Sequence, residues 1–491
     1  MLQYKSSKKI YKKARFYPNP TCNRVLKCIK EAENTTKCVI PGQELKKKSL
    51  RFLILGVIMQ MSALGRPTRE RKKEARMNGI HVTSEIGKLK KVCLHRPGDE
   101  LLNLPPDELE RLLFDDVPYL EVAQQEHDRF AEILREQGVE VLYLEKLVAE
   151  AFAANPGARD EFLDQYLAEA GIHGQKMPAI VREYLNTFTD DLEFVKKTMA
   201  GVAKSEIDMP LASSATLDDL VSDHSDKQSD LIIDPMPNLY FTRDPFACVG
   251  NGVNLNRMYS VTRNRETLYG KYIFKYHPDY KGTPLWFRRD APFHTEGGDV
   301  LNLTRTALAV GISQRTQAAA IDLMAQNIFW KTEGCEIEKI FAFDIPASRA
   351  FMHLDTVFTQ IDVDKFTIHP AIMGTLRVYE MTKGAVEGEV DIKEHTDSLE
   401  KILEYATGVD GIKLIPCGGG DPIAAAREQW NDGSNTLCVE PGTICVYQRN
   451  NVTNEVLYKE GLNLLVVPSA ELSRGRGGPR CMSMPFQRED L

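Results

Sequence analysis

The stretch that decides the fold lies between residues 300 and 346. It reads VLNLTRTALAVGIS (residues 300–313), then QRTQAAAIDLMAQ (residues 314–326), and it closes with KIFAFDIP (residues 339–346). Short apolar runs bounded by turn residues predict strands, and the run between them has the composition of a helix. The order of these elements predicts a unit of two strands, one helix and a third strand, written ββαβ.

Similar runs recur on both sides of this stretch. LYFTRDPFACV (residues 239–249) precedes it, and VFTQID (residues 357–362), NTLCVEPGTICVY (residues 435–447) and LNLLVVP (residues 462–468) follow it. Strand pairs that alternate with single helices favour repeated ββαβ units over one doubly wound parallel sheet. The fold class that we expect is therefore α/β.

The N-terminal side of the chain divides into two parts. Residues 77–145 begin with short strands closed by a Pro97-Gly98 turn; a helix follows, for which Asp116 is the expected cap and Pro118 suits the first turn. Gly138 ends this helix, and VEVLYL (residues 139–144) alternates as a strand. Residues 146–230 are rich in helix formers, which predicts an inserted helical domain, and residues 231–491 return to strands.

Residues 1–76 differ from the rest of the chain in charge. They carry 20 Lys or Arg and 5 Asp or Glu, a net of +15, whereas the remaining 415 residues carry 42 and 64, a net of −22. They show no apolar periodicity, and Lys73-Glu74-Ala75 can be encoded by a ribosome-binding sequence just before Met77. We therefore expect Met77 to be the natural start and 1–76 to be a basic leader; a genuine basic extension is the alternative.

Composition excludes several classes of protein. The chain of 491 residues is 27% charged with a net charge of −7, which is typical of a folded soluble protein and unlike a nucleic-acid binder. Its longest apolar run, FLILGVIM (residues 52–59), is too short to span a membrane. None of the ten cysteines forms a CxxC pair, and the zinc-protease and P-loop motifs are missing, so free thiols in a reducing cytoplasm are expected.

Residues suited to chemistry occur in short polar clusters. Cys481 follows a cationic, glycine-rich loop, RGRGGPR, which predicts a lowered thiol pKa and a nucleophile. His353 and Asp355 lie two apart, so on a strand they would share one face, as a general acid or base and its acidic neighbour do. Asp244 precedes Pro245, where a turn residue is the alternative interpretation.

A second cluster permits two interpretations. Glu296 and Asp299 flank Gly297-Gly298, where they are either turn carboxylates or, with His294, metal ligands. No third and fourth ligand cluster appears nearby, so no metal site is expected.

Seven segments, in this order, closely resemble the arginine deiminases of the guanidino-modifying enzyme superfamily. They are HVTSEIGKLKKVCLHRPG (residues 81–98), LLFDD (residues 112–116), PNLYFTRDPF (residues 237–246), EGGDV (residues 296–300), MHLDTVF (residues 352–358), AREQWNDGSNTL (residues 426–437) and RGRGGPRCMSMP (residues 474–485). The resemblance extends from about residue 77 to residue 491 and leaves the basic leader uncovered. Members of this family carry a helical insertion where residues 146–230 lie.

The resemblance implies a fold and an activity. The fold is a five-bladed ββαβ propeller, or pentein, with an inserted helical domain. The activity is hydrolysis of a C–N bond of the linear amidine L-arginine, giving L-citrulline and ammonia through a covalent S-alkylthiouronium, without metal or organic cofactor. A cytoplasmic enzyme that forms a homo-oligomer and binds neither nucleic acid nor membrane is expected.

The resemblance also assigns roles to individual residues. Cys481 is the nucleophile, His353 the acid and base, and Asp244 and Asp355 hold the guanidinium with support from Glu296. The residues expected to bind the rest of the substrate are Arg263, Arg315 and Arg476 at its carboxylate, with Asn238, Phe241 and Leu113 lining the pocket. Separate acidic and arginine clusters suit a zwitterionic amino acid with a cationic side chain.

The residue before the nucleophile and the choice of substrate each permit an alternative. The residue before the nucleophile is Arg480, where some family members have His, so we expect a pH optimum nearer neutral than in the His type. The alternative functions are another guanidino-modifying enzyme, such as an agmatine deiminase or an amidinotransferase, and a non-catalytic binding member of the fold. The arginines argue against agmatine, which lacks a carboxylate, and the presence of Cys481 and His353 argues against loss of catalysis.

Overall fold

The structure is a computed structural model that describes residues 38–40, 43–45, 79–172, 176–207, 230–331, 334–346, 351–372 and 376–491. The chain divides into two compact units, Met1–Ala75 and Arg76–Leu491. In the first unit, strands β1 (Cys38–Ile40) and β2 (Gln43–Leu45) pair antiparallel. The rest of residues 1–76 lies outside the described residues, so the basic leader and the start at Met77 stay predictions.

Residues 300–346 form the predicted ββαβ unit. Strand β10 (Val300–Asn302) pairs antiparallel with β11 (Ala307–Ile312), and β11 pairs parallel with β12 (Lys339–Asp344). The connecting helix, α13 (Ala318–Gln326), begins later than the predicted residue 314. The reason is a turn, because the hydroxyl of Ser313 accepts hydrogen bonds from the backbone N–H groups of Arg315 and Thr316.

Four further groups of strands in the described residues repeat this pattern, with one antiparallel and one parallel pairing each. The first group consists of β7 (Phe246–Val249), β8 (Gly252–Leu255), α12 (Thr267–Tyr276) and β9 (Leu285–Phe287), and the second of β13 (Phe358–Gln360), β14 (Lys365–Ile368), α15 (Leu399–Thr407) and β17 (Lys413–Pro416). The third group consists of β18 (Leu437–Glu440), β19 (Thr443–Tyr447), α17 (Asn451–Lys459) and β20 (Asn463–Val467). The fourth consists of β21 (Met484–Arg488), β3 (Leu89–Leu94), α5 (Leu120–Glu136) and β4 (Glu140–Tyr143). In the last group the C-terminal strand pairs with an N-terminal one. The α/β class with repeated ββαβ units is confirmed.

Other elements extend or connect these groups. Strands β15 (Arg377–Lys383) and β16 (Val390–His395) widen the β10 sheet to five strands. Three further α-helices are α11 (Val261–Asn264), α14 (Leu354–Val357) and α16 (Pro422–Trp430). The 3-10 helices are η1 (Pro106–Glu108), η2 (Lys204–Glu206), η3 (Pro237–Tyr240), η4 (Gly297–Asp299), η7 (Pro370–Ile372), η8 (Cys417–Gly420) and η9 (Leu472–Gly475). The element η5 (Asn327–Lys331) is a π-helix.

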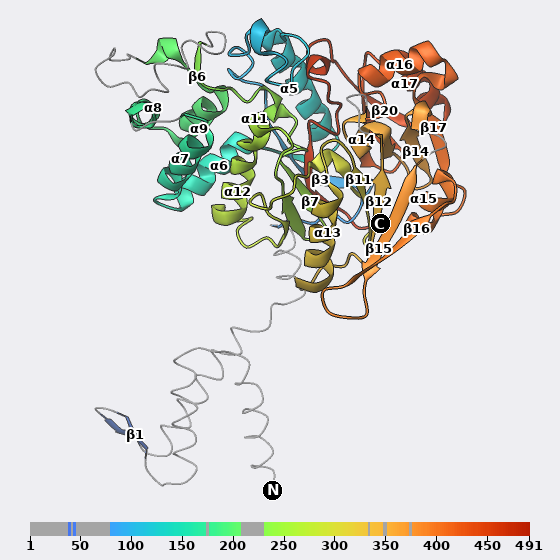
Figure 1. The fold of residues 1–491 in the computed structure, drawn as a ribbon, viewed down its shortest axis with the longest axis horizontal. Helices are drawn as coiled ribbons and strands as arrows, with labels where there is room; N and C mark the ends of the chain where they lie inside the picture. The colour runs from blue at the N-terminus through green and yellow to red at the C-terminus, as the bar shows by residue number, and fades with distance from the viewer. Residues whose placement is uncertain are drawn as a thin grey trace. The chain divides into compact units, whose positions relative to one another are not determined.

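The predicted helical segment is present as helices. It comprises α6 (Leu144–Ala154), α7 (Ala158–Glu169), α8 (Lys176–Asn186) and α9 (Asp191–Ala200), which lie together at one side of the second unit beside α12 (Figure 1). After them, β5 (Val202–Ala203) pairs with β6 (Leu231–Ile233). The ring centroids of Phe162 in α7 and Tyr272 in α12 lie 5.2 Å apart, so these helices share a core with the β7 group. That they form a separate domain over 146–230 stays a prediction.

The predicted start of α5 is wrong. The helix begins at Leu120, its N-cap is Tyr119, and no side chain caps it. Asp116 instead accepts a hydrogen bond from the backbone N–H of Val117 and forms an ion pair with Arg474. Its carboxylate is therefore used to join two loops rather than to cap a helix.

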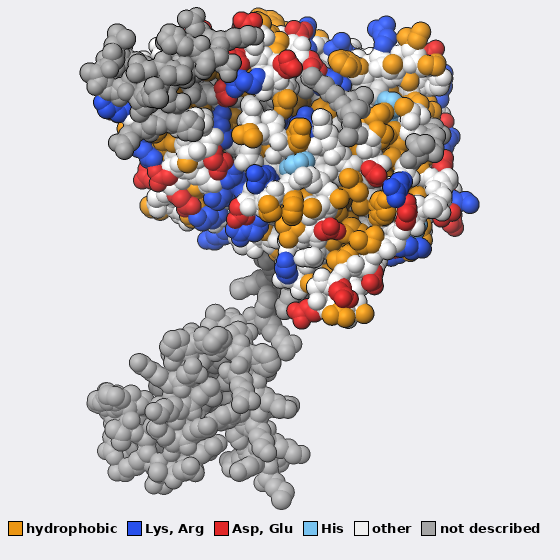
Figure 2. Space-filling model, in the orientation of Figure 1, with side chains coloured by type: hydrophobic (Ala, Val, Ile, Leu, Met, Phe, Trp, Pro, Cys, Tyr) orange, Lys and Arg blue, Asp and Glu red, His pale blue; other side chains and the backbone are white. Residues whose placement is uncertain are grey.

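The surface of the second unit mixes both signs of charge. Figure 2 shows basic and acidic side chains interspersed with hydrophobic ones over one face. Among the described residues, no helix combines the length and apolar character that crossing a membrane requires.

Candidate active site

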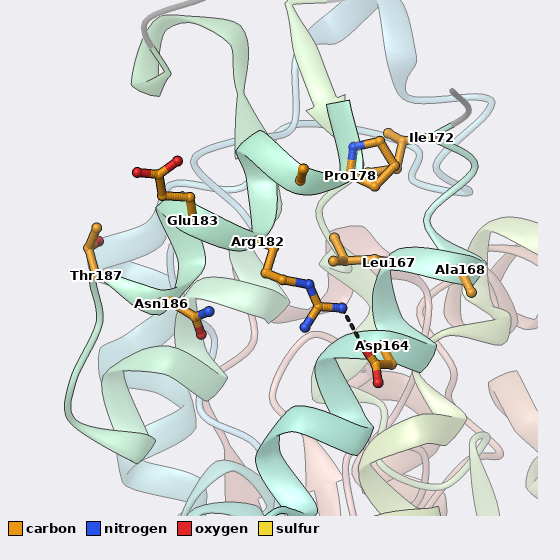
Figure 3. A pocket seen from close by; sticks show the side chains of 10 residues that line it. Asp164, Leu167, Ala168, Ile172, Pro178, Arg182, Glu183, Asn186 and Thr187 are labelled. Atoms are coloured by element: carbon orange, nitrogen blue, oxygen red, sulfur yellow. Dashed lines mark hydrogen bonds and ion pairs between the residues drawn. The ribbon is translucent and has the colours of Figure 1, made fainter. Parts of the chain in front are cut away.

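Two hollows in the second unit differ in size and in chemistry. The larger, about 740 Å³, lies between α7 and α8, and Figure 3 shows Arg182 pointing across it toward Asp164, with which it forms an ion pair. Its lining contains no cysteine or histidine, and its charged side chains are partly or largely exposed. It therefore offers a surface groove without a nucleophile or a buried charge.

The smaller cavity, about 290 Å³, holds most of the residues singled out from the sequence. The predicted site residues that line it are Cys481, His353, Asp244, Arg263, Arg315, Arg476, Asn238, Phe241 and Leu113. Glu296 and Asp355 do not line it, but both are fully buried and contact residues that do. All eleven predicted residues thus lie in or directly behind one cavity.

The ββαβ repeat explains why distant residues meet. Asp244 comes just before β7, Glu296 before β10, His353 before β13 and Cys481 before β21, so each lies in the loop that enters the first strand of a unit. Hydrogen bonds join these loops: the N–H of Gly297 donates to the carbonyl of Asp244 over 3.1 Å, and the N–H of Arg243 donates to the carbonyl of Cys481 over 3.1 Å. A fifth loop, before β18, contributes Asn435, whose Oδ1 accepts from the N–H of Cys481 at 3.1 Å.

Glycine permits the close approach of these loops. A Cβ on Gly298 would lie 2.6 Å from the ring of His353, and a Cβ on Gly477 would lie 2.2 Å from the ring of Phe241. Any side chain at these two positions would displace a residue of the cavity.

The environment of Cys481 corrects the sequence interpretation. Burial raises the pKa of its thiol well above the ordinary value, and the carboxylates of Asp355, Asp244 and Asp432 raise it further, opposed by Arg480. Its Sγ lies 3.6 Å from Oδ2 of Asp355. The expectation that the cationic loop lowers this pKa is wrong for the free protein, in which Cys481 is a neutral thiol.

Arg480 offsets only part of the rise in the thiol pKa, and its guanidinium is already bound by carboxylates. Its Nη1 lies 2.7 Å from Oδ2 of Asp355, its Nε and Nη2 donate to Glu85 at 3.1 and 3.2 Å, and Nη2 also donates to the carbonyl of Val300. Burial alone would raise the pKa of Glu85, but Arg480, with the charges of Arg243 and Arg488, lowers that pKa to about 2. The guanidinium of Arg480 therefore fixes Asp355 in place.

His353 is held as an imidazolium. Its Nε2 lies 2.8 Å from Oε2 of Glu296, and its Nδ1 lies 3.9 Å from Oδ1 of Asp244. Burial alone would lower its pKa, but Asp244 and the hydrogen bond to Glu296 raise it to about 9. The strand argument for His353 and Asp355 is wrong, since α14 begins at Leu354, where Asp299 accepts the backbone N–H.

The same three groups have the geometry of a metal-binding cluster. Ligand atoms of Asp244, Glu296 and His353 lie within 4.8 Å of one another, whereas His294, the third ligand proposed from the sequence, has its Nδ1 2.7 Å from the carbonyl of Arg315. A histidine ligand must be unprotonated, and the raised pKa of His353 favours the proton over a cation at neutral pH.

Each of the two aspartates has one oxygen bound and one unbound. Oδ2 of Asp244 lies 3.0 Å from Nη1 of Arg263, while Oδ1 of Asp244 and Oδ1 of Asp355 are buried without a hydrogen-bond partner. Arg263 is bound in turn by Glu266, whose Oε2 is 2.9 Å from Nη2. Burial raises the pKa of Glu266 to about 7, opposed by Arg263.

Arg315 and Arg476 are bound much less completely. Nη1 of Arg315 lies 3.6 Å from Oε1 of Glu296, and Nε of Arg476 lies 3.5 Å from Oδ2 of Asp115. In both side chains Nε and Nη1 are buried and make no hydrogen bond. Both arginines line the cavity, so it contains cationic side chains whose capacity for charge-assisted hydrogen bonds is not fully used within the protein.

Backbone strain gathers around this cavity. Leu113, Asp432 and Arg476 have φ values of 59°, 56° and 61°, and in the described part of the chain no other non-glycine residue has a positive φ. Two of them line the cavity, and Asp432 lies close enough to Arg476 for its charge to act on the carboxyl group. Such strain is typical of functional sites.

Several neighbours of the site were not identified from the sequence. They are Glu110, Asp115, Tyr259, Gln314, Met352 and Thr356, which line the cavity, and Glu266, Asp432 and Glu85, which interact with Arg263, Arg476 and Arg480. The sequence spacing could have identified Glu266, because it follows Arg263 by three residues on a helical stretch, where two such side chains can form an ion pair. Burial raises the pKa of Asp432 to about 7, which no local pattern indicates.

Comparison with known proteins completes the description of the site. Residues 110–488 match the family model described as arginine deiminase. The chain is 59% identical over 414 residues to an arginine deiminase of Treponema denticola, 56% over 415 residues to one of Streptococcus gordonii, and 53% over 418 residues to one of Clostridium perfringens. Each alignment covers 84% of this chain and 98–99% of the relative.

Solved structures give a weaker likeness. A dimethylarginine dimethylaminohydrolase bound to S-methyl-L-thiocitrulline has a TM-score of 0.45 at 13% identity, covering 81% of this chain and 100% of that one. An amidinotransferase from Microseira wollei in the saxitoxin biosynthetic pathway has a TM-score of 0.45 at 14% identity, covering 84% and 98%. At these values the likeness adds nothing to the sequence comparison.

Proposed function

Because this chain belongs to the arginine deiminase family, we propose that it hydrolyses L-arginine to L-citrulline and ammonia through a covalent S-alkylthiouronium on Cys481. The observation that supports this most directly is the polarity of the 290 Å³ cavity. Carboxylate oxygens and arginine N–H groups that lack hydrogen-bond partners belong to residues that line this cavity or lie directly behind it. A zwitterionic amino acid with a guanidinium side chain complements both sets.

The guanidinium is oriented by the two aspartates. The unbound Oδ1 atoms of Asp244 and Asp355 accept its N–H groups, while Arg263 and Arg480 hold the other oxygen of each carboxylate. Glu296 supports this end by fixing His353. Such orientation brings the guanidinium carbon against Sγ of Cys481.

Substrate binding also activates the nucleophile. In the free site three carboxylates oppose the thiolate, which keeps the pKa of Cys481 high. The bound guanidinium adds a positive charge beside the sulfur, lowers this pKa, and allows the thiol proton to leave to water.

The two half-reactions share His353. Sγ of Cys481 attacks the guanidinium carbon, and the C–N bond breaks as the imidazolium of His353 gives its proton to the departing ammonia. Water then attacks the thiouronium carbon while the neutral imidazole takes one proton from it. The C–S bond breaks as the remaining hydroxyl proton passes to the departing sulfur, which releases citrulline and restores the thiol of Cys481. Covalent catalysis thereby replaces one difficult displacement by two easier ones.

Arg315 and Arg476 are proposed to bind the α-carboxylate, with Asn238, Phe241 and Leu113 as walls of the pocket. Arg263 also lines the pocket, but Asp244 and Glu266 occupy its donors, so we assign it chiefly to positioning Asp244. Agmatine lacks the carboxylate that these arginines suit, and neither a metal nor an organic cofactor is needed for the steps above.

We further propose that the five strand groups are the blades of a pentein propeller around this site, with the helices of residues 146–230 as an inserted domain. Hydrogen bonds that join the five strand-entry loops at or directly behind one cavity support this arrangement. A cytoplasmic enzyme that assembles as a homo-oligomer, with no nucleic-acid or membrane partner, is the expected setting.

The test is a citrulline assay on the purified full chain with Cys481→Ala as its control. We expect wild-type protein to release citrulline from L-arginine and to leave agmatine almost untouched, and Cys481→Ala to be inactive. A variant rate within tenfold of wild type would refute the role of Cys481, and carbamoylputrescine from agmatine at a comparable rate would refute the substrate.

A further inference from the structure

The arginines at the site are held in two different ways. Arg263 and Arg480 are bound by carboxylates, which occupy their N–H groups. Arg315 and Arg476 instead rest on aromatic rings, and their Nε and Nη1 atoms make no hydrogen bond.

The contact of Arg476 is the closer one. Its Cζ lies 3.7 Å from the ring centroid of Trp430, the shortest such distance among the described residues. Trp430 is the last residue of α16 and is 56% exposed, whereas the side chain of Arg476 is only 9% exposed. The indole therefore covers the guanidinium from the solvent side.

Arg315 repeats this arrangement at a greater distance. Its Cζ lies 5.4 Å from the ring of Tyr259, which is 46% exposed, while the side chain of Arg315 is 9% exposed. Two half-exposed aromatic rings thus cover two buried guanidinium groups with unused donors.

Stacking on a ring has a consequence that binding by a carboxylate does not. The ring attracts the cation through its face and fixes the plane of the guanidinium, but it accepts none of the N–H groups at the edge. Those donors stay available for a ligand. The left-handed φ of 61° at Arg476, which is costly for a non-glycine residue, indicates that its side chain is needed at this place.

We propose that Trp430 is a positioning residue for recognition of the substrate α-carboxylate: its indole holds the guanidinium of Arg476 in the orientation that binds the carboxylate, and Tyr259 does the same for Arg315. The inference rests on the proposed function. It assigns to two surface aromatic residues the selection of arginine over guanidines that lack a carboxylate.

The first experiment compares steady-state kinetics of Trp430→Leu and Trp430→Phe with L-arginine. For Trp430→Leu we expect KM to rise about three- to tenfold, the size of a lost, partly desolvated cation–π contact, with kcat within twofold of wild type. Trp430→Phe keeps a ring face and should stay within about threefold of wild-type KM. Tyr458→Leu, at a residue that is 72% exposed on α17, is the matched control and should change neither constant.

The second experiment separates positioning from a structural effect. Binding of L-arginine and of agmatine is measured by calorimetry in a Cys481→Ala background, with and without Trp430→Leu. We expect the Kd of L-arginine to rise about three- to tenfold and the Kd of agmatine, which has no carboxylate, to change less than twofold.

The outcomes are distinguishable. If wild-type protein releases no citrulline, the proposed function fails whatever Trp430 does. If it does release citrulline but Trp430→Leu leaves KM and Kd unchanged, or weakens both ligands equally, the inference is overturned and the proposed function stands. Loss of kcat with an unchanged KM would overturn it as well.

Discussion

The two sets of charged groups at this site are built in opposite ways. In the carboxylate cluster (Asp244, Glu296, Asp355 and His353) an arginine or histidine binds an oxygen of each carboxylate at 2.7 to 3.0 Å. In the arginine pair (Arg315 and Arg476) the nearest carboxylate oxygens lie 3.6 and 3.5 Å away, and aromatic rings cover the guanidinium groups.

This difference teaches how one cavity separates chemistry from recognition. Groups that direct bond breaking must be fixed before the substrate arrives, so their orientation is set by ion pairs within the protein. Groups that recognise the distant end of the substrate must keep their hydrogen bonds for it, so they are held by contacts that use none. Removing a member of the first set should therefore lower kcat, and removing one of the second should raise KM.

The largest effect is expected from the aspartates. Asp355→Asn and Asp244→Asn remove a charge that faces the guanidinium, and kcat/KM should fall by about 10³-fold, as when one electrostatic partner of a transition state is removed. The measurement is citrulline release under subsaturating L-arginine. Asp290→Asn, in an exposed ion pair, is the control. If kcat/KM of the two site variants falls less than tenfold, the division into a carboxylate cluster that directs bond breaking and an arginine pair that recognises substrate is contradicted.

A smaller effect with a distinct pH signature is expected for Glu296→Gln. The first step needs protonated His353, whose raised pKa of about 9 places the loss of activity above that pH. Without the charge of Glu296 this pKa falls, so the alkaline limb of the kcat profile should move to lower pH, and kcat at pH 7 should fall by about 10- to 100-fold. An unchanged alkaline limb would show that Glu296 does not set the protonation of His353.

Recognition should respond differently. Arg315→Gln removes a charge-assisted contact with the carboxylate, so KM for L-arginine should rise about 10- to 100-fold while kcat falls much less. Steady-state kinetics measure this split, with Arg288→Gln, in an exposed ion pair, as the matched control. An effect on kcat alone would show that Arg315 acts with the carboxylate cluster in bond breaking and not in recognition of the carboxylate.

The smallest effect on activity is expected in the framework of the loop that carries Arg476. Glu126 in α5 accepts the backbone N–H groups of Ala470, Glu471 and Leu472. Glu126→Gln should destabilise the fold by about 1–3 kcal/mol, since buried donors lose a charged acceptor, and should change KM less than about threefold. Thermal denaturation measures it against Glu132→Gln, an exposed carboxylate on the same helix; equal melting temperatures would contradict this role.

Local patterns were enough to predict the ββαβ units, whereas most of the residues that line the cavity were predicted from the resemblance to the arginine deiminases. The strand runs of residues 300–346 fold as expected, because apolar runs between turns carry their structure in the local sequence. Cys481 and His353 could be identified because they lie in short polar motifs next to strands. The start of α5 was misjudged because Asp116 forms its ion pair with Arg474, which is 358 residues away.

The electrostatics could not be predicted for the same reason. Arg480 and Glu85 are 395 residues apart, and Asp355 is 125 residues from Arg480, so the sequence gives no sign that this arginine is occupied. The cationic loop consequently predicts the wrong direction for the thiol pKa of Cys481. Trp430 over Arg476 is likewise a contact between the end of α16 and a distant loop, which no local spacing indicates.

The measurement that tests the central claim most directly is mass spectrometry of the protein quenched during turnover of L-arginine. The account predicts a covalent adduct on the peptide that contains Cys481, with the mass of L-arginine minus ammonia, that forms within one turnover and disappears as citrulline is released. Citrulline production by wild-type protein with no such adduct, or with the adduct on a residue other than Cys481, would contradict it.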